Sequence, residues 1–287
     1  MSSAEKNKIM IKNDLTTHKI SVAGLNSSYL TIGSGKPIIL LHGWGGNKDS
    51  WRLLIEALKT IDFDFGKFRL YALDLPGFGD SAEPKQGWNV ENYTNWLEKL
   101  LIKIYKDDEL KGDYDLIVHS FGGRILMKLF DRQFVHEAGV AKPDRLVMIA
   151  AAGIKPTETF RIKVAKCAAR IGKSVMSLPL LNRLAPLAQK ILYKALRTHD
   201  YEKSSGVMRD TFLKVINEDL KGSLDHITNP TLIAWGVRDS YVPVNDARLM
   251  HEKIIGSELH IIKDGKHGIH KTHAPQIAVW IKQFLNK

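Results

Sequence analysis

The sequence predicts an α/β fold in which a mostly parallel, doubly wound sheet carries one inserted helical cap. Short runs rich in Ile, Leu and Val alternate with longer segments whose apolar residues recur every three or four positions. The runs are typical of strands buried on both faces, and the longer segments are typical of helices packed on a sheet. From 155 to 223 the runs stop and the helical spacing continues alone. This segment is therefore expected to lie as a cap over the carboxyl edge of the sheet.

A β-hairpin is expected first, formed by residues 18–24 and 27–33 and followed by a Gly-Ser-Gly-Lys turn. Apolar runs then predict strands at 37–43, 68–75, 114–120, 144–153, 230–236 and 258–265. Segments of helical spacing predict helices at 49–61, 89–106, 121–134, 245–255 and 272–285. The core domain is then expected to comprise residues 1–154 and 224–287, with residues 155–223 as the cap.

The composition fits one core with an insertion, since 287 residues that are 44% hydrophobic can bury a large apolar interior. Cys167 is the single cysteine, which excludes an internal disulfide framework and suits a reducing compartment. No apolar run reaches the ~18 residues of a membrane span, and the first residues lack the apolar core of a signal peptide. We therefore expect a cytoplasmic protein with no stable membrane insertion.

Most of the formal net charge of +11 lies between residues 155 and 214. Basic residues recur there at helical spacing in two stripes: Lys163, Lys166, Arg170 and Lys173, and then Arg183, Lys190, Lys194 and Arg197. A solvated helix face is the favoured interpretation, and weak contact with an anionic surface such as acidic lipid or an acidic acyl carrier is the alternative. Nucleic acid is not expected as a partner, because basic and aromatic residues are not interleaved in a binding module.

The stretch DLIVHSFGGR (115–124) places Ser120 where a predicted strand turns into a predicted helix. A serine hydroxyl is a weak nucleophile and must stand clear of the chain for a base to reach it. A tight strand-to-helix turn achieves this, and Gly122 and Gly123 leave the room that the turn needs. The helix that begins at Phe121 directs its first N–H groups and its positive dipole end at the serine. The stretch predicts a nucleophile, and an ordinary glycine-rich connection is the alternative.

The stretch HGWGG (42–46) follows another predicted strand and has a glycine-rich backbone. The amide of Trp44, together with the amide of Phe121, is expected to form an oxyanion hole, in which one donor is worth ~3 kcal/mol of transition-state stabilisation. The side chain of His42 is expected to bond the backbone and is not assigned to catalysis.

Two later strand ends supply an acid and a base. Asp239 follows the run at 230–236, and His267 follows the run at 258–265. Because the carboxyl ends of parallel strands share one edge of a sheet, both residues are expected beside Ser120. The chain order of serine, acid and histidine is the one expected when the nucleophile lies on an earlier strand.

Two alternatives concern the neighbouring histidines. His267, His270 and His273 recur at three-residue spacing. His270 is the alternative candidate for the base. A metal site formed by the three is the weaker alternative, since no carboxylate or cysteine cluster accompanies them, and no metal is expected.

Taken together, HGWGG, DLPGFGDS, HSFGG, WGVRD and KHGIH resemble the α/β-hydrolase superfamily, in the order and approximate spacing of that family. The resemblance extends from about residue 20 to residue 284. It implies the α/β-hydrolase fold with a helical cap, as in the serine esterase and lactonase branch. It also implies Ser120 as nucleophile, His267 as general base and Asp239 as the acid that orients the base, with no cofactor.

Two features qualify the resemblance. Val118 stands where the G-x-S-x-G pattern has its first glycine, and the distance from His267 to the downstream Pro275 is longer than in the family pattern. Asp74, in DLPGFGDS, is expected to be structural.

The function expected is hydrolysis of a small-molecule carboxylic ester or lactone through an acyl-enzyme. The alternatives on the same fold are a thioesterase, a C–C bond hydrolase, an aminopeptidase or a perhydrolase. A ligand-binding protein without turnover is the alternative from another class. The sequence assigns no oligomeric state.

Overall fold

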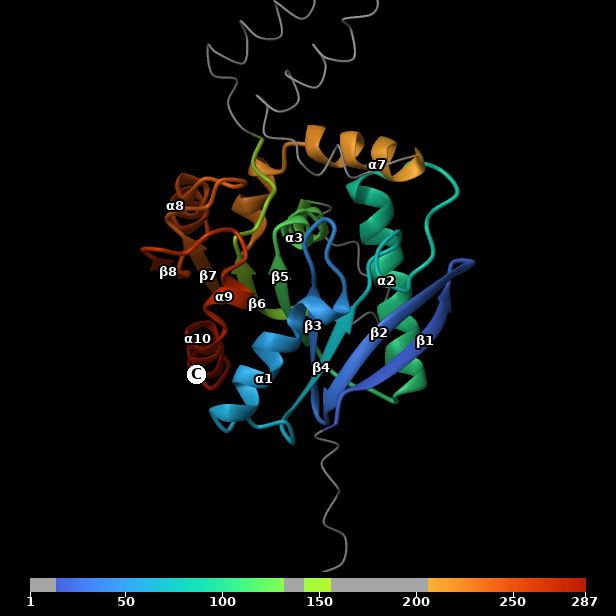
Figure 1. Ribbon diagram of the computed structural model, residues 1–287, viewed down its shortest axis with the longest axis horizontal. Helices are drawn as coiled ribbons and strands as arrows, with labels where there is room; N and C mark the ends of the chain where they lie inside the picture. The colour runs from blue at the N-terminus through green and yellow to red at the C-terminus, as the bar shows by residue number, and fades with distance from the viewer. Residues whose placement is uncertain (1–13, 132–141, 156–205) are drawn as a thin grey trace, which may run out of the picture.

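The structure, a computed structural model, describes residues 14–131, 142–155 and 206–287. The described residues form one eight-stranded sheet in the order β1-β2-β4-β3-β5-β6-β7-β8 (Figure 1). The strands are β1 (Thr16–Val22), β2 (Leu25–Gly33), β3 (Lys36–Leu41), β4 (Phe68–Leu73), β5 (Tyr114–His119), β6 (Pro143–Ile149), β7 (Thr231–Gly236) and β8 (Glu258–Ile262). β1 and β2 form an antiparallel hairpin, and β2 pairs antiparallel with β4. The remaining neighbours in the sheet, β4, β3, β5, β6, β7 and β8, pair in parallel. The predicted fold class is confirmed.

Helices cover both faces of the sheet (Figure 1). They are η2 (Lys48–Trp51), α1 (Arg52–Thr60), α2 (Val90–Asp107), α3 (Phe121–Asp131), α7 (Gly206–Asn217), η4 (Lys221–His226), α8 (Val244–Lys253), α9 (Ile269–Thr272) and α10 (Ala274–Leu285). α1 and α10 pack on one face, and α2, α3 and α8 pack on the other. α7 lies across the carboxyl edge of the strands (Figure 1).

Two predicted helices begin differently in the structure. The first begins as the 3-10 helix η2 before α1. The last, predicted over 272–285, begins at Ala274 with Pro275 in its first turn, and the separate short helix α9 ends just before it at Thr272. Proline is tolerated in a first turn because its missing N–H leaves no hydrogen bond unmade there. The start of α10 therefore fits the position of the proline.

Most of the predicted cap lies outside the described residues, as do Cys167 and both basic stripes. The described part of the cap is α7 and the start of η4. The two ends of the cap, at residues 153–155 and 218–220, are called its stems below, and they are hydrogen-bonded to each other. The amide of Leu220 donates to the carbonyl of Gly153 at 2.9 Å, and the amide of Lys155 donates to the carboxylate of Asp219 at 3.2 Å. From α3, the buried guanidinium of Arg124 donates to the carbonyl of Glu218 at 2.8 Å.

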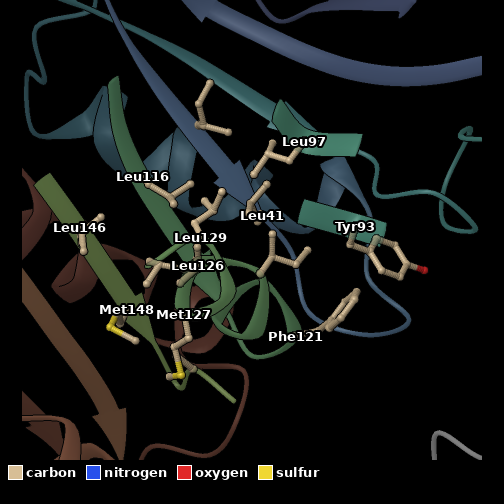
Figure 2. Packing of buried hydrophobic residues seen from close by; sticks show 14 of the residues in the cluster. Leu41, Tyr93, Leu97, Leu116, Phe121, Leu126, Met127, Leu129, Leu146 and Met148 are labelled. Carbon is tan, nitrogen blue, oxygen red and sulfur yellow. The ribbon is translucent and has the colours of Figure 1, made fainter. Parts of the chain in front are cut away.

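Strand residues alternate between two apolar clusters, one on each face of the sheet. On β3, Ile39 and Leu41 face the α2 and α3 side, while Ile38 and Leu40 face the α1 and α10 side. Figure 2 shows the first cluster, in which residues of β3, β5 and β6 meet residues of α2 and α3. Burial on both faces explains why these strands read as nearly continuous apolar runs.

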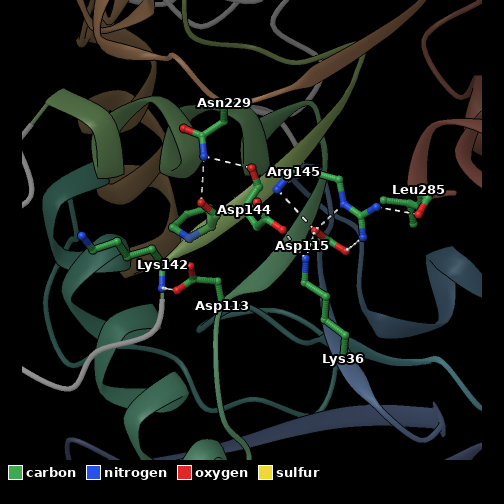
Figure 3. Close-up of polar contacts among 9 residues, drawn as sticks. Lys36, Asp113, Asp115, Lys142, Asp144, Arg145, Asn229 and Leu285 are labelled. Atoms are coloured by element: carbon green, nitrogen blue, oxygen red, sulfur yellow. Dashed lines mark hydrogen bonds and ion pairs between the residues drawn. The ribbon is translucent and has the colours of Figure 1, made fainter. Parts of the chain in front are cut away.

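The amino edge of the sheet is fixed by a buried carboxylate. Asp115, which is 1% exposed, accepts hydrogen bonds from Lys36 Nζ at 2.8 Å and from Arg145 Nε and Nη2 at 3.0 and 2.6 Å (Figure 3). Arg145 also donates to the carbonyl of Leu285, at the end of α10. One acid thus joins β3, β5, β6 and the last helix.

The loops at the opposite, carboxyl edge are also fixed by buried polar groups. The amide and Nζ of Lys48 donate to the two carboxylate oxygens of Asp74, at 2.6 and 2.8 Å, and both side chains are buried. His42 donates from Nδ1 to the carbonyl of Gly43 at 2.7 Å and accepts at Nε2 from the amide of Leu75 at 3.0 Å. These contacts hold the loop after β3 against the loop after β4.

The first prediction concerns Asp115. Asp115→Asn removes the carboxylate but leaves Arg145 and Lys36 beside it, and we expect the free energy of unfolding to fall by about 3 kcal/mol. Asp144→Asn is the matched control. Its carboxylate also pairs with Lys36 but is 50% exposed, so we expect a loss of less than ~1 kcal/mol. Urea unfolding followed by circular dichroism measures both, and equal losses would contradict this account.

The second prediction concerns acid stability. Burial lowers the pKa of His42 to about 4, and both of its nitrogens are already engaged. An unfolded histidine binds its proton near the ordinary pKa of ~6.5, so stability is complete above that pH and is lost as the pH falls towards about 4. Asn cannot titrate in this range. In His42→Asn the free energy of unfolding should therefore fall less than in the wild type between about pH 7 and about pH 5, by about 2 kcal/mol. Urea titrations at both pH values test this, and equal slopes for the two proteins would refute it.

Candidate active site

Ser120 lies in a sharp turn between β5 and α3. Its φ of 48° is in the left-handed region that residues other than glycine rarely adopt. The turn is held by its own backbone, since the carbonyl of Ser120 accepts from the amides of Gly123 at 2.9 Å and Ala152 at 2.8 Å. The amide of Ser120 donates to the carbonyl of Ile149 at 3.2 Å. These bonds fix the hydroxyl above the carboxyl edge of the sheet.

The paired glycines are explained by close approach. A Cβ on Gly122 would lie 2.5 Å from the carbonyl oxygen of Leu41 on β3, and a Cβ on Gly123 would lie 2.6 Å from the Cβ of Ala151. Any larger residue would push α3 away from the sheet. Val118, by contrast, is fully buried within β5, between Leu41 on β3 and Met148 on β6. The valine therefore belongs to the core, and the turn begins only after it.

The structure brings the three predicted side chains together. His267 Nε2 lies 2.9 Å from Ser120 Oγ, and His267 Nδ1 lies 2.8 Å from Asp239 Oδ2. A carboxylate can only accept, so Nδ1 carries the proton and Nε2 is left to accept from the serine hydroxyl. The three groups thus form one continuous chain of hydrogen bonds. They lie in the turn after β5 and in the loops after β7 and β8.

Asp239 is held so that only one oxygen faces the histidine. Its other oxygen, Oδ1, accepts from the amides of Tyr241 at 2.8 Å and Val242 at 2.9 Å, and its side chain is fully buried. The ring of Tyr241 stacks on the ring of His267, with centroids 4.9 Å apart. Nearby, at the start of α8, burial and the charge of Asp239 raise the pKa of Asp246 to about 6. The carboxylate of Asp239 is thus fixed by the backbone.

The neighbouring histidines lie elsewhere. His270 is buried between the rings of Trp51 and His119, and burial lowers its pKa to about 3. His273 faces Asp264 at 3.5 Å. The geometry therefore favours His267 as the base, because it is the histidine within hydrogen-bond distance of Ser120. In the described part of the chain, no group of three His, Cys, Asp or Glu residues could hold a metal ion.

The rings of Trp44 and Phe121, the two residues expected to form the oxyanion hole, are in contact. Phe121 is the first residue of α3, where the first N–H groups have no partner within the helix. The ring of Trp44 lies 5.3 Å from that of Phe121, 4.9 Å from that of Phe78 and 5.0 Å from that of Phe212 on α7. These four residues are called the aromatic wall below. Whether the two amides bind an oxyanion stays a prediction.

Sequence reasoning left several residues of the site without a role. Phe78 lies in the DLPGFGDS motif, beyond η2, α1 and β4, and Phe212 lies on α7, so no local pattern could have placed either ring against Trp44. Tyr241 lies two residues after Asp239, but its ring contact with His267 depends on how the loop turns. His119 could have been singled out from the sequence, because a histidine at the end of an otherwise apolar strand is unusual. Its contacts are described below.

Comparison with known proteins agrees with this architecture. A family described as alpha/beta hydrolase fold matches residues 36–274. The chain is 27% identical to the AB hydrolase superfamily protein YisY of Bacillus subtilis, over 89% of this chain and 93% of that protein. It is 22% identical to a pimeloyl-[acyl-carrier protein] methyl ester esterase of Aliivibrio fischeri, over 90% and 96%. An esterase from Exiguobacterium antarcticum superposes with a TM-score of 0.66 at 20% identity, covering 94% of this chain and 99% of that one.

Within the described residues, no helix has the length and apolar character needed to cross a membrane. The family match covers most of the chain, and the eight-stranded, mostly parallel sheet agrees with it. The chain belongs to the alpha/beta hydrolase family.

Proposed function

We propose that this protein is a serine hydrolase that cleaves carboxylic esters or lactones through an acyl-enzyme. The observation that carries the proposal is the hydrogen-bonded chain from Asp239 through His267 to Ser120. It gives a weak nucleophile a base within reach, and it gives that base a fixed tautomer.

In the first half of the reaction, Oγ of Ser120 attacks the substrate carbonyl carbon while Nε2 of His267 takes the hydroxyl proton. The carbonyl π electrons move onto oxygen, and the amides of Trp44 and Phe121 stabilise that charge. The tetrahedral intermediate then expels the alkoxide, which takes the proton from His267 as it leaves. An acyl-enzyme on Ser120 and an alcohol result.

In the second half, water replaces the alcohol. Nε2 of His267 takes a proton from the water as its oxygen attacks the acyl carbon. When the second intermediate collapses, the proton returns to Oγ of Ser120 and the carboxylic acid is released. Asp239 keeps its negative charge throughout and stabilises the transient imidazolium of His267, which is why its burial and its two backbone donors matter.

An apolar acyl group suits the surroundings of Ser120. The aromatic wall stands beside the turn, with Trp44 and Phe78 only partly buried, and it carries no charge. Two compared proteins are called esterases, the pimeloyl-[acyl-carrier protein] methyl ester esterase and the Exiguobacterium enzyme. Their names support ester cleavage as the class of reaction. A panel of short esters, lactones, thioesters and aminoacyl amides separates the substrate classes.

The third prediction tests the nucleophile. Ser120→Ala should lower kcat for p-nitrophenyl butyrate by at least ~10⁴-fold, since it removes the hydroxyl that forms the acyl-enzyme. A fluorophosphonate probe should label the wild type at Ser120, as located by mass spectrometry of peptides. Ser257→Ala is the control, because that hydroxyl bonds His251 at the end of α8, and it should keep full turnover. A wild type that neither turns over nor reacts would instead favour a ligand-binding protein.

The fourth prediction tests the orienting acid. Asp239→Asn keeps the shape of the side chain but can no longer fix the tautomer of His267, so we expect kcat to fall by about 10⁴-fold. Asp246 is a nearby carboxylate on α8. Asp246→Asn should change kcat by less than about fivefold, because this carboxylate makes no hydrogen bond to His267. Steady-state kinetics measure both. Comparable losses in the two variants would mean that the net charge of the region, and not the bond to His267, is what matters.

A further inference from the structure

The proposed mechanism leaves one buried imidazole unused directly beside the nucleophile. His119 is the last residue of β5 and is 7% exposed. The preceding residues of that strand include Leu116, Ile117 and Val118, which are packed in the core. A polar ring at this point of an apolar strand is costly to bury unless its nitrogens are used.

One nitrogen is bonded to the loop that carries the base. Nε2 of His119 lies 3.0 Å from the backbone carbonyl oxygen of His267. A carbonyl oxygen can only accept, so Nε2 carries the proton and donates it. The strand end that holds the nucleophile is thus bonded to the backbone of the residue that must reach it.

The other side of the same ring meets the loop of the expected oxyanion hole. A Cβ on Gly43 would lie 2.7 Å from Nδ1 and 3.1 Å from Cε1 of His119, so the ring occupies the space that the glycine leaves. The ring centroid lies 4.0 Å from that of His270 and 4.8 Å from that of His267. One side chain therefore lies between the loops that follow β3 and β8.

The ring is a neutral donor. Burial, together with the neighbouring His270 and His267, holds the pKa of His119 well below its ordinary value. His119 therefore adds no positive charge beside His267 when that residue takes the proton from Ser120. Its contribution is a single hydrogen bond to a carbonyl oxygen, and this can be removed without changing any charge.

We propose that His119 is a positioning residue, whose Nε2–H holds the backbone of His267 so that the catalytic imidazole stays aligned between Asp239 and Ser120. This inference rests on the proposed function. Its effect should lie in kcat and not in substrate binding, because the donor contacts the base loop and not the aromatic wall. A misplacement of the order of 1 Å is enough to cost about 100-fold in rate.

The fifth prediction compares two replacements of similar length. His119→Gln keeps an N–H donor, and His119→Met has no donor. We expect Met to lower kcat for p-nitrophenyl butyrate by about 10- to 100-fold with KM within about threefold, and Gln to stay within about threefold of wild type in both. The rate of fluorophosphonate labelling of Ser120 should fall with kcat. His119→Phe, which keeps a ring without a donor, should behave like Met.

His270→Phe is the packing control, since that side chain lies in the same cluster but makes no bond to the base, and it should keep kcat within about threefold. Equal losses for Gln and Met, or no loss for Met and Phe, would overturn the positioning role. The positioning role would also be overturned if the Met and Phe variants failed to fold, as judged by circular dichroism, while the Gln variant was fully active. The donor would then be needed for folding. Absence of turnover and labelling in the wild type would refute the proposed hydrolase itself, whereas an active wild type with an unaffected Met variant refutes only the role of His119.

Discussion

The left-handed backbone of Ser120 is the constraint on which the rest of the structure depends. A non-glycine residue in this region costs about 1–3 kcal/mol and persists only where its surroundings determine it. Here they do, because the carbonyl of Ser120 accepts two amides and α3 packs on β3 with no room for a side chain at Gly122. The same turn fixes the serine hydroxyl and the first turn of α3. The strain is local, and the apolar core under β5 is what sustains it.

The loops around that turn are fixed by buried polar groups as much as by packing. Lys48 and Asp74 form a buried pair, His42 uses both ring nitrogens on backbone groups, and Asp239 accepts two amides. A buried polar group is costly unless it is bonded, so each of these groups stabilises the loop conformation in which its bonds are made. Such groups define a loop conformation more narrowly than apolar contacts, which tolerate sliding. A reaction that needs three side chains aligned to fractions of an ångström benefits from this.

The strands and the three site residues could be predicted from the sequence, whereas the end of β8 and the contacts between distant segments could not. Strands such as β3 and β5 were recognisable because burial on both faces demands continuous apolar runs. Ser120, Asp239 and His267 were placed at one edge because parallel strands end there, and their hydrogen bonds agree with that placement, although their catalytic roles stay a prediction. The apolar run at 258–265 predicted a strand longer than β8. The strand ends at Ile262, where the amide of Gly265 donates to the carbonyl of Ile262 in a turn. The contact of Trp44 with Phe212 has no local signal, since it depends on how distant segments pack.

The fastening of the two stems, from Gly153 and Lys155 to Asp219 and Leu220, has a consequence for how such a chain can diversify. Bonds between the stems hold both ends of the intervening stretch together, and the entropic cost of closing a loop grows only slowly with its length. Insertions, deletions or wholesale replacement between the stems should leave the sheet and its turn undisturbed. Chimaeras that exchange this stretch between relatives should therefore keep the carboxyl edge of the sheet and the side chains that lie there.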